Sequence, residues 1–137
     1  MRFAAGFALR LLLLLGLAAL PGCGDSGEYA VVPVSGIVTC QGKPVANATV
    51  NFSPKASEER SAQNPGKLAL GMTDAQGHFQ LTTYENNDGA IIGTHTVTVS
   101  LNFDESTGKE PRGFPCKNSQ LEITIDKSVS DLKVDFK

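Results

Sequence analysis

The side chains that could take part in chemistry are few and lie far apart in this sequence. Its three cysteines are Cys23, Cys40 and Cys116. A cysteine or serine nucleophile needs a neighbouring base and an orienting group. No histidine lies near Cys116 in sequence, and neither a Gly-x-Ser-x-Gly motif nor a phosphate-binding glycine loop is present. We therefore expect no catalytic residue, no enzymatic activity and no cofactor.

The two histidines and the acidic turns do not predict a metal site. His78 follows a turn and is expected to point to solvent. His95 falls on the apolar face of an alternating segment and is expected to be a hydrogen-bonded residue at the rim of the core. Calcium needs roughly six to eight oxygen ligands, whereas the turn from Asp74 to Gly77 offers one carboxylate, which is expected to bond to its own backbone. No metal ligands are therefore predicted.

The first 22 residues have the composition of an export signal. Arg2 and Arg10 supply positive charge, Leu11 to Leu20 is wholly apolar, and Pro21-Gly22 would break a helix. A charged segment, an apolar segment of roughly 7–15 residues and small residues at a cleavage point make a secretory signal peptide. A spanning helix needs about 20 apolar residues, and Arg10 interrupts the stretch, so a retained membrane anchor is the alternative.

The residues at the expected cleavage point suggest a particular kind of signal. Leu20-Pro21-Gly22-Cys23 resembles the lipobox of bacterial lipoprotein precursors, in which an aliphatic residue and two small residues precede a cysteine. In that family the cysteine thiol takes a diacylglyceryl group and the cysteine becomes the new N-terminus. The resemblance implies that residues 1–22 are removed and that Cys23 is lipidated, with residues 23–31 as a flexible tether. Ordinary cleavage nearby, with Cys23 a free or paired thiol, is the alternative.

The cysteine count is consistent with lipidation. An odd number of cysteines in an exported chain needs an explanation. A lipid on Cys23 would supply one and leave Cys40 and Cys116 as a pair in an oxidising compartment, where a disulfide persists. The alternative is two buried thiols, because free cysteine packs as a small hydrophobe.

The charge of the expected mature chain argues against nucleic acid as a partner. Removal of residues 1–22 takes away two arginines and no acid, so 12 basic residues become 10 against 14 acidic ones, a formal net charge of −4. Phosphate binding requires clustered Lys and Arg. The remaining length suits one domain.

Residues 32–137 repeat one pattern, in which short segments alternate apolar and polar residues between turns. The predicted strands are Val32–Cys40, Ala46–Phe52, Lys67–Thr73, His78–Tyr84, Thr94–Phe103, Gln120–Asp126 and Asp131–Lys137. Apolar residues on one face of each strand predict an all-β fold, a seven-stranded antiparallel β-sandwich. Among the residues expected to face the core are Ala46, Leu68, Leu70, Met72 and Phe103. The long loops Lys55–Gly66 and Asp104–Ser119 are expected at the surface.

The order of these segments resembles carboxypeptidase regulatory-like domains. The resemblance rests on Val34–Thr39 with Gly42–Val45 and Ala48–Phe52, on Thr73–Phe79, and on Gly93–Val99. It implies a transthyretin-like (prealbumin-like), Ig-like sandwich, and its combination with a lipobox is similar to lipoproteins of Planctomycetes. Two enzyme families share this sandwich, but the C-terminal signature of one and the closely spaced histidines of the other are missing. The family's usual aromatic residue is replaced by His95.

The expected function is therefore a non-catalytic, membrane-tethered module of the cell envelope. Its expected partners are the membrane, through the lipid on Cys23, and other envelope proteins or glycans at the long loops. The alternative is an envelope lipoprotein that binds a small ligand or carbohydrate. That function would require exposed aromatic residues around a concavity, for which Tyr29, Tyr84 and Phe114 are the candidates.

Overall fold

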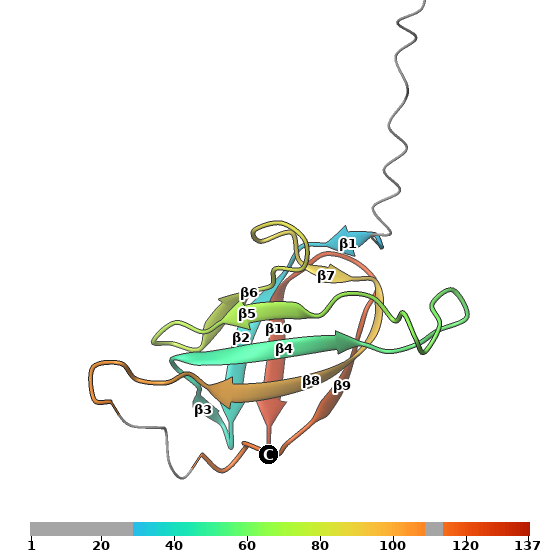
Figure 1. The fold of residues 1–137 in the computed structure, drawn as a ribbon. Helices are drawn as coiled ribbons and strands as arrows, with labels where there is room; N and C mark the ends of the chain where they lie inside the picture. The colour runs from blue at the N-terminus through green and yellow to red at the C-terminus, as the bar shows by residue number, and fades with distance from the viewer. Residues whose placement is uncertain (1–28, 109–113) are drawn as a thin grey trace, which may run out of the picture.

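The computed structural model describes residues 29–108 and 114–137 of the chain. The expected signal peptide at 1–22, the expected lipidation site Cys23 and most of the expected tether lie outside the described residues. The described part is all-β, as the sequence predicts (Figure 1). Within these two ranges no helix has the length and apolar character needed to cross a membrane.

The described residues form ten strands rather than the seven expected. The strands are β1 (Val31–Val32), β2 (Val34–Cys40), β3 (Lys43–Pro44), β4 (Ala48–Pro54), β5 (Ala69–Met72), β6 (His78–Gln80), β7 (Ala90–Ile91), β8 (Gly93–Leu101), β9 (Leu121–Ile125) and β10 (Val129–Phe136). Pro33 lacks a backbone N–H and divides the first predicted strand into β1 and β2. The two-residue strands β3 and β7 were not predicted and account for the other additional strands.

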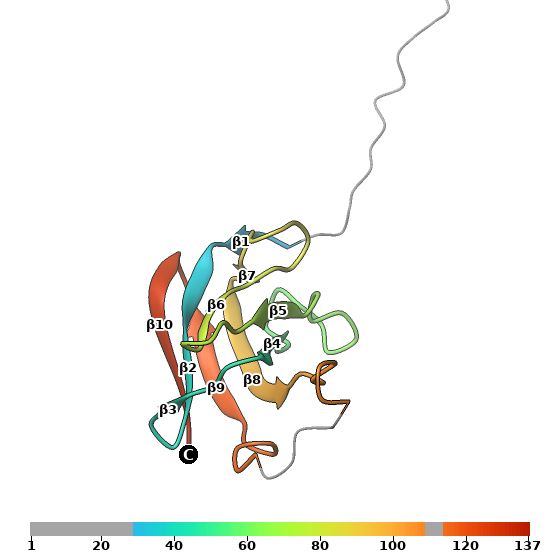
Figure 2. The same cartoon turned by 90° about the vertical axis from the view of Figure 1, so that its left-hand side faces the viewer.

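Two four-stranded sheets face each other around one core (Figure 2). One sheet has the order β5-β4-β8-β9, and all its pairs are antiparallel. In the other, β2 is central and pairs with β10 on one side and with β3 and β6 on the other. A separate pair, β1 with β7, lies at one end.

The expectation of an entirely antiparallel sandwich is wrong at one pair of strands. β10 runs parallel to β2, with Leu132 opposite Gly36 and Phe136 opposite Cys40. The physical reason is the connection after β9, which carries the chain from one sheet into the other. β10 therefore joins β2 instead of returning along β9. Apolar alternation gives no information on this choice, because it is the same for both strand directions.

The core consists of the inward side chains of both sheets. The largest contributions come from side chains with no exposed surface, namely Val38, Val50, Phe52, Leu81, Val97, Val134 and Phe136. Leu121, Ile123 and Leu132 are partly buried against them, as their alternation predicts. Burial of one such side chain contributes about 1.5–3 kcal/mol.

The predicted face of β5 is wrong, because the strand is turned over. Ala69 and Gly71 face the core, whereas Leu68, Leu70 and Met72 are exposed, Met72 by 71%. The cause is lack of space inside. A Cβ atom at Gly71 would lie 3.0–3.1 Å from Gln80 O, Leu81 and Phe79, so only the small residues of this segment fit against the second sheet.

Two further residues expected in the core are exposed. At Ala46 the alternation is displaced by Asn47, which has a positive φ of 49°, so Val45 and Ala48 are buried and Ala46 is not. At the other position, β8 ends at Leu101, and Asn102 N donates to Asn47 O. This bond ends the alternation and leaves Phe103 54% exposed.

Candidate functional site

A disulfide closes the end of the domain at which β2 and β10 finish. The Sγ atoms of Cys40 and Cys116 are at bonding distance, with 6.0 Å between the Cα atoms, and both residues are buried. The bridge attaches the predicted loop Asp104–Ser119, through Cys116, to the end of β2. Gln41 N donates to Phe136 O at the same place, so β2, β10 and the loop are joined there.

A hollow of about 340 Å³ lies beside this disulfide. Its walls are the β2–β3 turn, the end of β8 and the residues before Cys116, and its apolar lining includes Pro44, Val45, Leu101, Phe114 and Pro115. Phe114, a predicted contact residue, therefore lies in a concavity. Both walls of the hollow are held in place, one by the pairing of β3 with β2 and the other by the disulfide.

Tyr29 and Tyr84, the other two predicted contact residues, lie together at the end marked by β1. Tyr29 N donates to Tyr84 Oη at 3.0 Å, and Tyr29 Oη donates to Asn64 O at 3.1 Å. Because Tyr29 bonds to Tyr84 and β1 begins at Val31, residues 29–31 of the expected tether 23–31 pack with the domain. Figure 1 shows β1 and β3 at opposite ends, so these tyrosines lie far from Phe114.

Arg60 attaches the predicted surface loop Lys55–Gly66 to the body of the domain. Its side chain is only 5% exposed, and its Nη1 donates to Ile92 O at 2.7 Å. Its guanidinium also lies 5.8 Å from the ring centre of Tyr29. Most of the loop is exposed, as predicted, but the buried arginine was not foreseen because a single charged residue among polar neighbours looks solvated.

His95 is fully buried on the inner face of β8. Its Nδ1 lies 3.0 Å from Gly93 O, and its ring packs edge-on to Phe52 with 5.9 Å between ring centres. Because a carbonyl only accepts, Nδ1 carries the proton. Burial lowers the pKa of His95 below its ordinary value of 6.5, and the nearby Arg60 charge lowers it further. His95 is therefore a neutral packing residue. The sequence correctly predicts its inward position and hydrogen bond, but it lies inside the core rather than at the expected rim.

Two aspartates hold turns by accepting backbone hydrogen bonds. Asp74 Oδ1 accepts from His78 N and from Gln76 N, each at 2.9 Å, and these bonds lower the pKa of Asp74. Asp88 accepts from the backbone N–H groups of three successive residues, 83–85. Burial alone would raise the pKa of Asp88, but these bonds lower it overall. Both carboxylates are thus used within the fold, as the sequence predicts for Asp74.

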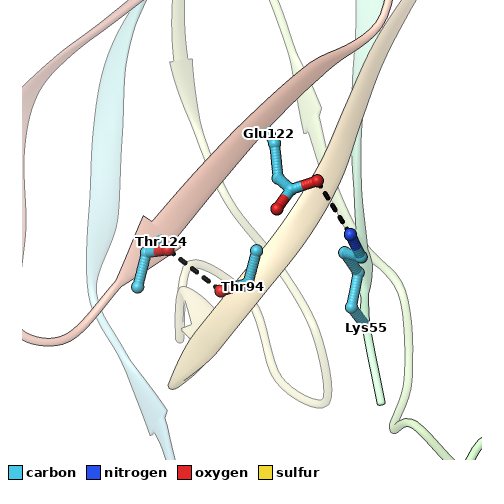
Figure 3. A network of polar contacts seen from close by, with 4 residues as sticks. All are labelled: Lys55, Thr94, Glu122 and Thr124. Carbon is cyan, nitrogen blue, oxygen red and sulfur yellow. Dashed lines mark hydrogen bonds and ion pairs between the residues drawn. The ribbon is translucent and has the colours of Figure 1, made fainter. Parts of the chain in front are cut away.

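The outer face of β4, β8 and β9 is polar, whereas β5 exposes Leu70 and Met72. Figure 3 shows two of the polar contacts on this face. Lys55 Nζ lies 2.7 Å from Glu122 Oε2, and the hydroxyls of Thr94 and Thr124 are 3.0 Å apart. Both members of the ion pair are about half exposed, so it contributes at most about 1 kcal/mol. This face supplies cross-strand pairs rather than a site.

The residues that could react are not gathered at one point of the described structure. His78 is exposed at the start of β6, His95 is inside the core, and the two tyrosines contact each other. No group of three His, Cys, Asp or Glu residues within 29–108 and 114–137 is arranged to hold a metal ion. In comparisons with known proteins, the chain matches no protein-family model, no curated protein and no solved structure.

Proposed function

We propose that this chain is a non-catalytic lipoprotein of the cell envelope, a β-sandwich module of seven main strands tethered to a membrane through Cys23. The observation that carries the proposal is the disulfide between Cys40 and Cys116. The bridge uses both cysteines of the domain and suits an oxidising compartment. It leaves Cys23, which directly follows the apolar segment and Leu20-Pro21-Gly22, as the one remaining cysteine.

The tethered part in this proposal is a carboxypeptidase regulatory-like, transthyretin-like domain, which the sequence motifs within Val34–Phe52, Thr73–Phe79 and Gly93–Val99 support. In this proposal the two sheets are a rigid scaffold, and contacts with envelope proteins or glycans are made by the loops at its ends. Of the two predicted loops, Asp104–Ser119 is the better candidate for these contacts, because it carries Phe114 beside the hollow, whereas Arg60 fixes the Lys55–Gly66 loop to the scaffold.

Palmitate labelling tests the proposed anchor directly. The full chain is expressed with labelled palmitate in a bacterium that processes lipoproteins, beside Cys23→Ala and beside a Cys40→Ala, Cys116→Ala variant. Label on the wild type and on the double variant, but not on Cys23→Ala, is the expected result. An unlabelled wild-type chain that accumulates in the soluble fraction would overturn the proposal.

A second candidate function, the binding of a small ligand or carbohydrate, is favoured by the hollow beside Phe114. An aromatic ring in a concavity of about 340 Å³ is a plausible contact for a sugar ring or a small apolar group. Saccharide titrations followed by NMR would show shifts at Leu101 and Val45 that Phe114→Ala abolishes. If the shifts are absent, or are unchanged by Phe114→Ala, this function is excluded for the hollow.

A further inference from the structure

Six exposed or half-buried residues lie at the end of the domain where the described chain begins, and they are here called the tether face. Its members are Tyr29, Ala30, Lys67, Leu68, Tyr84 and Ile92. Tyr29 N bonds to Tyr84 Oη, Ile92 N bonds to Ala30 O, and Lys67 Nζ lies 5.5 Å from the ring centre of Tyr84. These contacts join three separate parts of the chain at the end where β1 pairs with β7.

The tether face exposes apolar side chains that the fold itself does not use. Ile92 is 43% exposed directly after the buried Ile91, and Leu68 is 38% exposed directly before the buried Ala69. The two tyrosines are half-buried beside them. Aliphatic side chains with tyrosine and lysine at their border are the composition that suits the boundary between lipid headgroups and acyl chains.

The length of the connecting chain determines which end of the domain meets a membrane. Only six peptide steps separate Cys23 from Tyr29, and an extended chain covers at most about 3.6 Å per residue, or about 22 Å. A lipid on Cys23 therefore keeps the tether face within reach of the bilayer surface. The hollow at Phe114 lies at the opposite end (Figure 1).

We propose that the tether face docks on the lipid surface, so that the domain lies against the bilayer with its Phe114 end facing away. This inference rests on the proposed lipid anchor at Cys23. Ile92 and Leu68 enter the headgroup region, and the rings of Tyr29 and Tyr84 lie at its border. Glu85, next to Tyr84 in sequence, is also exposed, so this end carries an acidic as well as a basic side chain and the proposed docking does not require anionic lipid.

The test attaches the lipid chemically, so that it does not depend on processing in cells. The mature chain from Cys23 to Lys137 is coupled through the Cys23 thiol to maleimide lipid in phosphatidylcholine nanodiscs that also contain a gadolinium-chelating lipid. Cys40 and Cys116 are oxidised and do not react. NMR relaxation of methyl groups reports their distance from the bilayer, with Ile92 and Leu68 on the tether face and Leu101, beside the hollow, as the matched control.

The expected relaxation enhancement is several times greater at Ile92 and Leu68 than at Leu101. It remains so when a flexible Gly-Ser segment of 20 residues is inserted after Gly24, because the face itself binds lipid. In the double variant Ile92→Ser, Leu68→Ser the methyl group of Ala30 is the reporter for this end, and its excess over Leu101 is lost in the extended chain, whereas Phe103→Ser keeps it. Equal enhancement at both ends in the extended wild-type chain would overturn docking. Failure of palmitate labelling in cells would instead reject the anchor and leave this result unaffected.

Discussion

Reduction of the Cys40–Cys116 disulfide is expected to remove a large share of the stability of the domain. The bridge joins residues that are 76 positions apart. A cross-link over that distance lowers the entropy of the unfolded chain by an amount equivalent to about 4.5 kcal/mol at 25 °C in the chain-entropy model. Single domains have a stability of about 5–15 kcal/mol. The reduced chain should therefore remain folded in water but unfold at a much lower urea concentration.

The measurement is urea unfolding followed by circular dichroism, with and without a thiol reductant. The mature chain carries Cys23→Ser, so that the bridge is the one redox-active group. Reduction leaves both sulfur atoms in place, so the difference reports the cross-link and not a cavity. The Cys40→Ala, Cys116→Ala variant is the control and should be slightly less stable than the reduced chain, because its side chains leave small voids. Equal unfolding midpoints for the oxidised and reduced chains would refute the reasoning.

Three other substitutions test how the fold is held together. Because burial lowers the pKa of His95, the folded state favours its neutral form. The free energy of unfolding should therefore be highest above about pH 6.5 and fall as the pH drops through the lowered pKa. His95→Phe should flatten this pH dependence, and a variant whose stability falls with pH as steeply as that of the wild type would contradict the prediction. Gly36→Ala should lower the free energy of unfolding in urea by about 1–3 kcal/mol, because the added Cβ would overlap Leu132 O of β10; an unchanged midpoint would show that β10 moves freely. The Asp88 carboxylate accepts hydrogen bonds from the amides of residues 83–85. Asp88→Ala should therefore accelerate hydrogen exchange at these amides, while the β8 amides serve as the control.

The alternation of apolar residues predicts most of the core but does not determine the face of every strand. In β8 the large residues lie on one face and threonine or serine on the other, so the prediction is correct for Val97 and Val99. In β5 the larger apolar residues are on the outside, because Gly71 is the residue that fits against Leu81 and Phe79. That restriction comes from the second sheet and is absent from the local pattern.

The candidate site was only partly accessible from the sequence. Counting left the Cys40–Cys116 bridge as one of two possibilities, which the structure decides, and alternation predicts the inward position of His95. The buried Arg60 does not, because its partner Ile92 O is a backbone atom distant in sequence. The contact between Tyr29 and Tyr84 is likewise a tertiary one, and it moves Tyr29 from the expected tether into the domain.

The central claim, that the chain is anchored through Cys23, is tested most directly by mass spectrometry of the N-terminal peptide from membrane-extracted protein. We expect a peptide that begins at Cys23 and carries a diacylglyceryl group in thioether linkage. A peptide that retains residues before Cys23, or one in which the Cys23 thiol is unmodified, would contradict it.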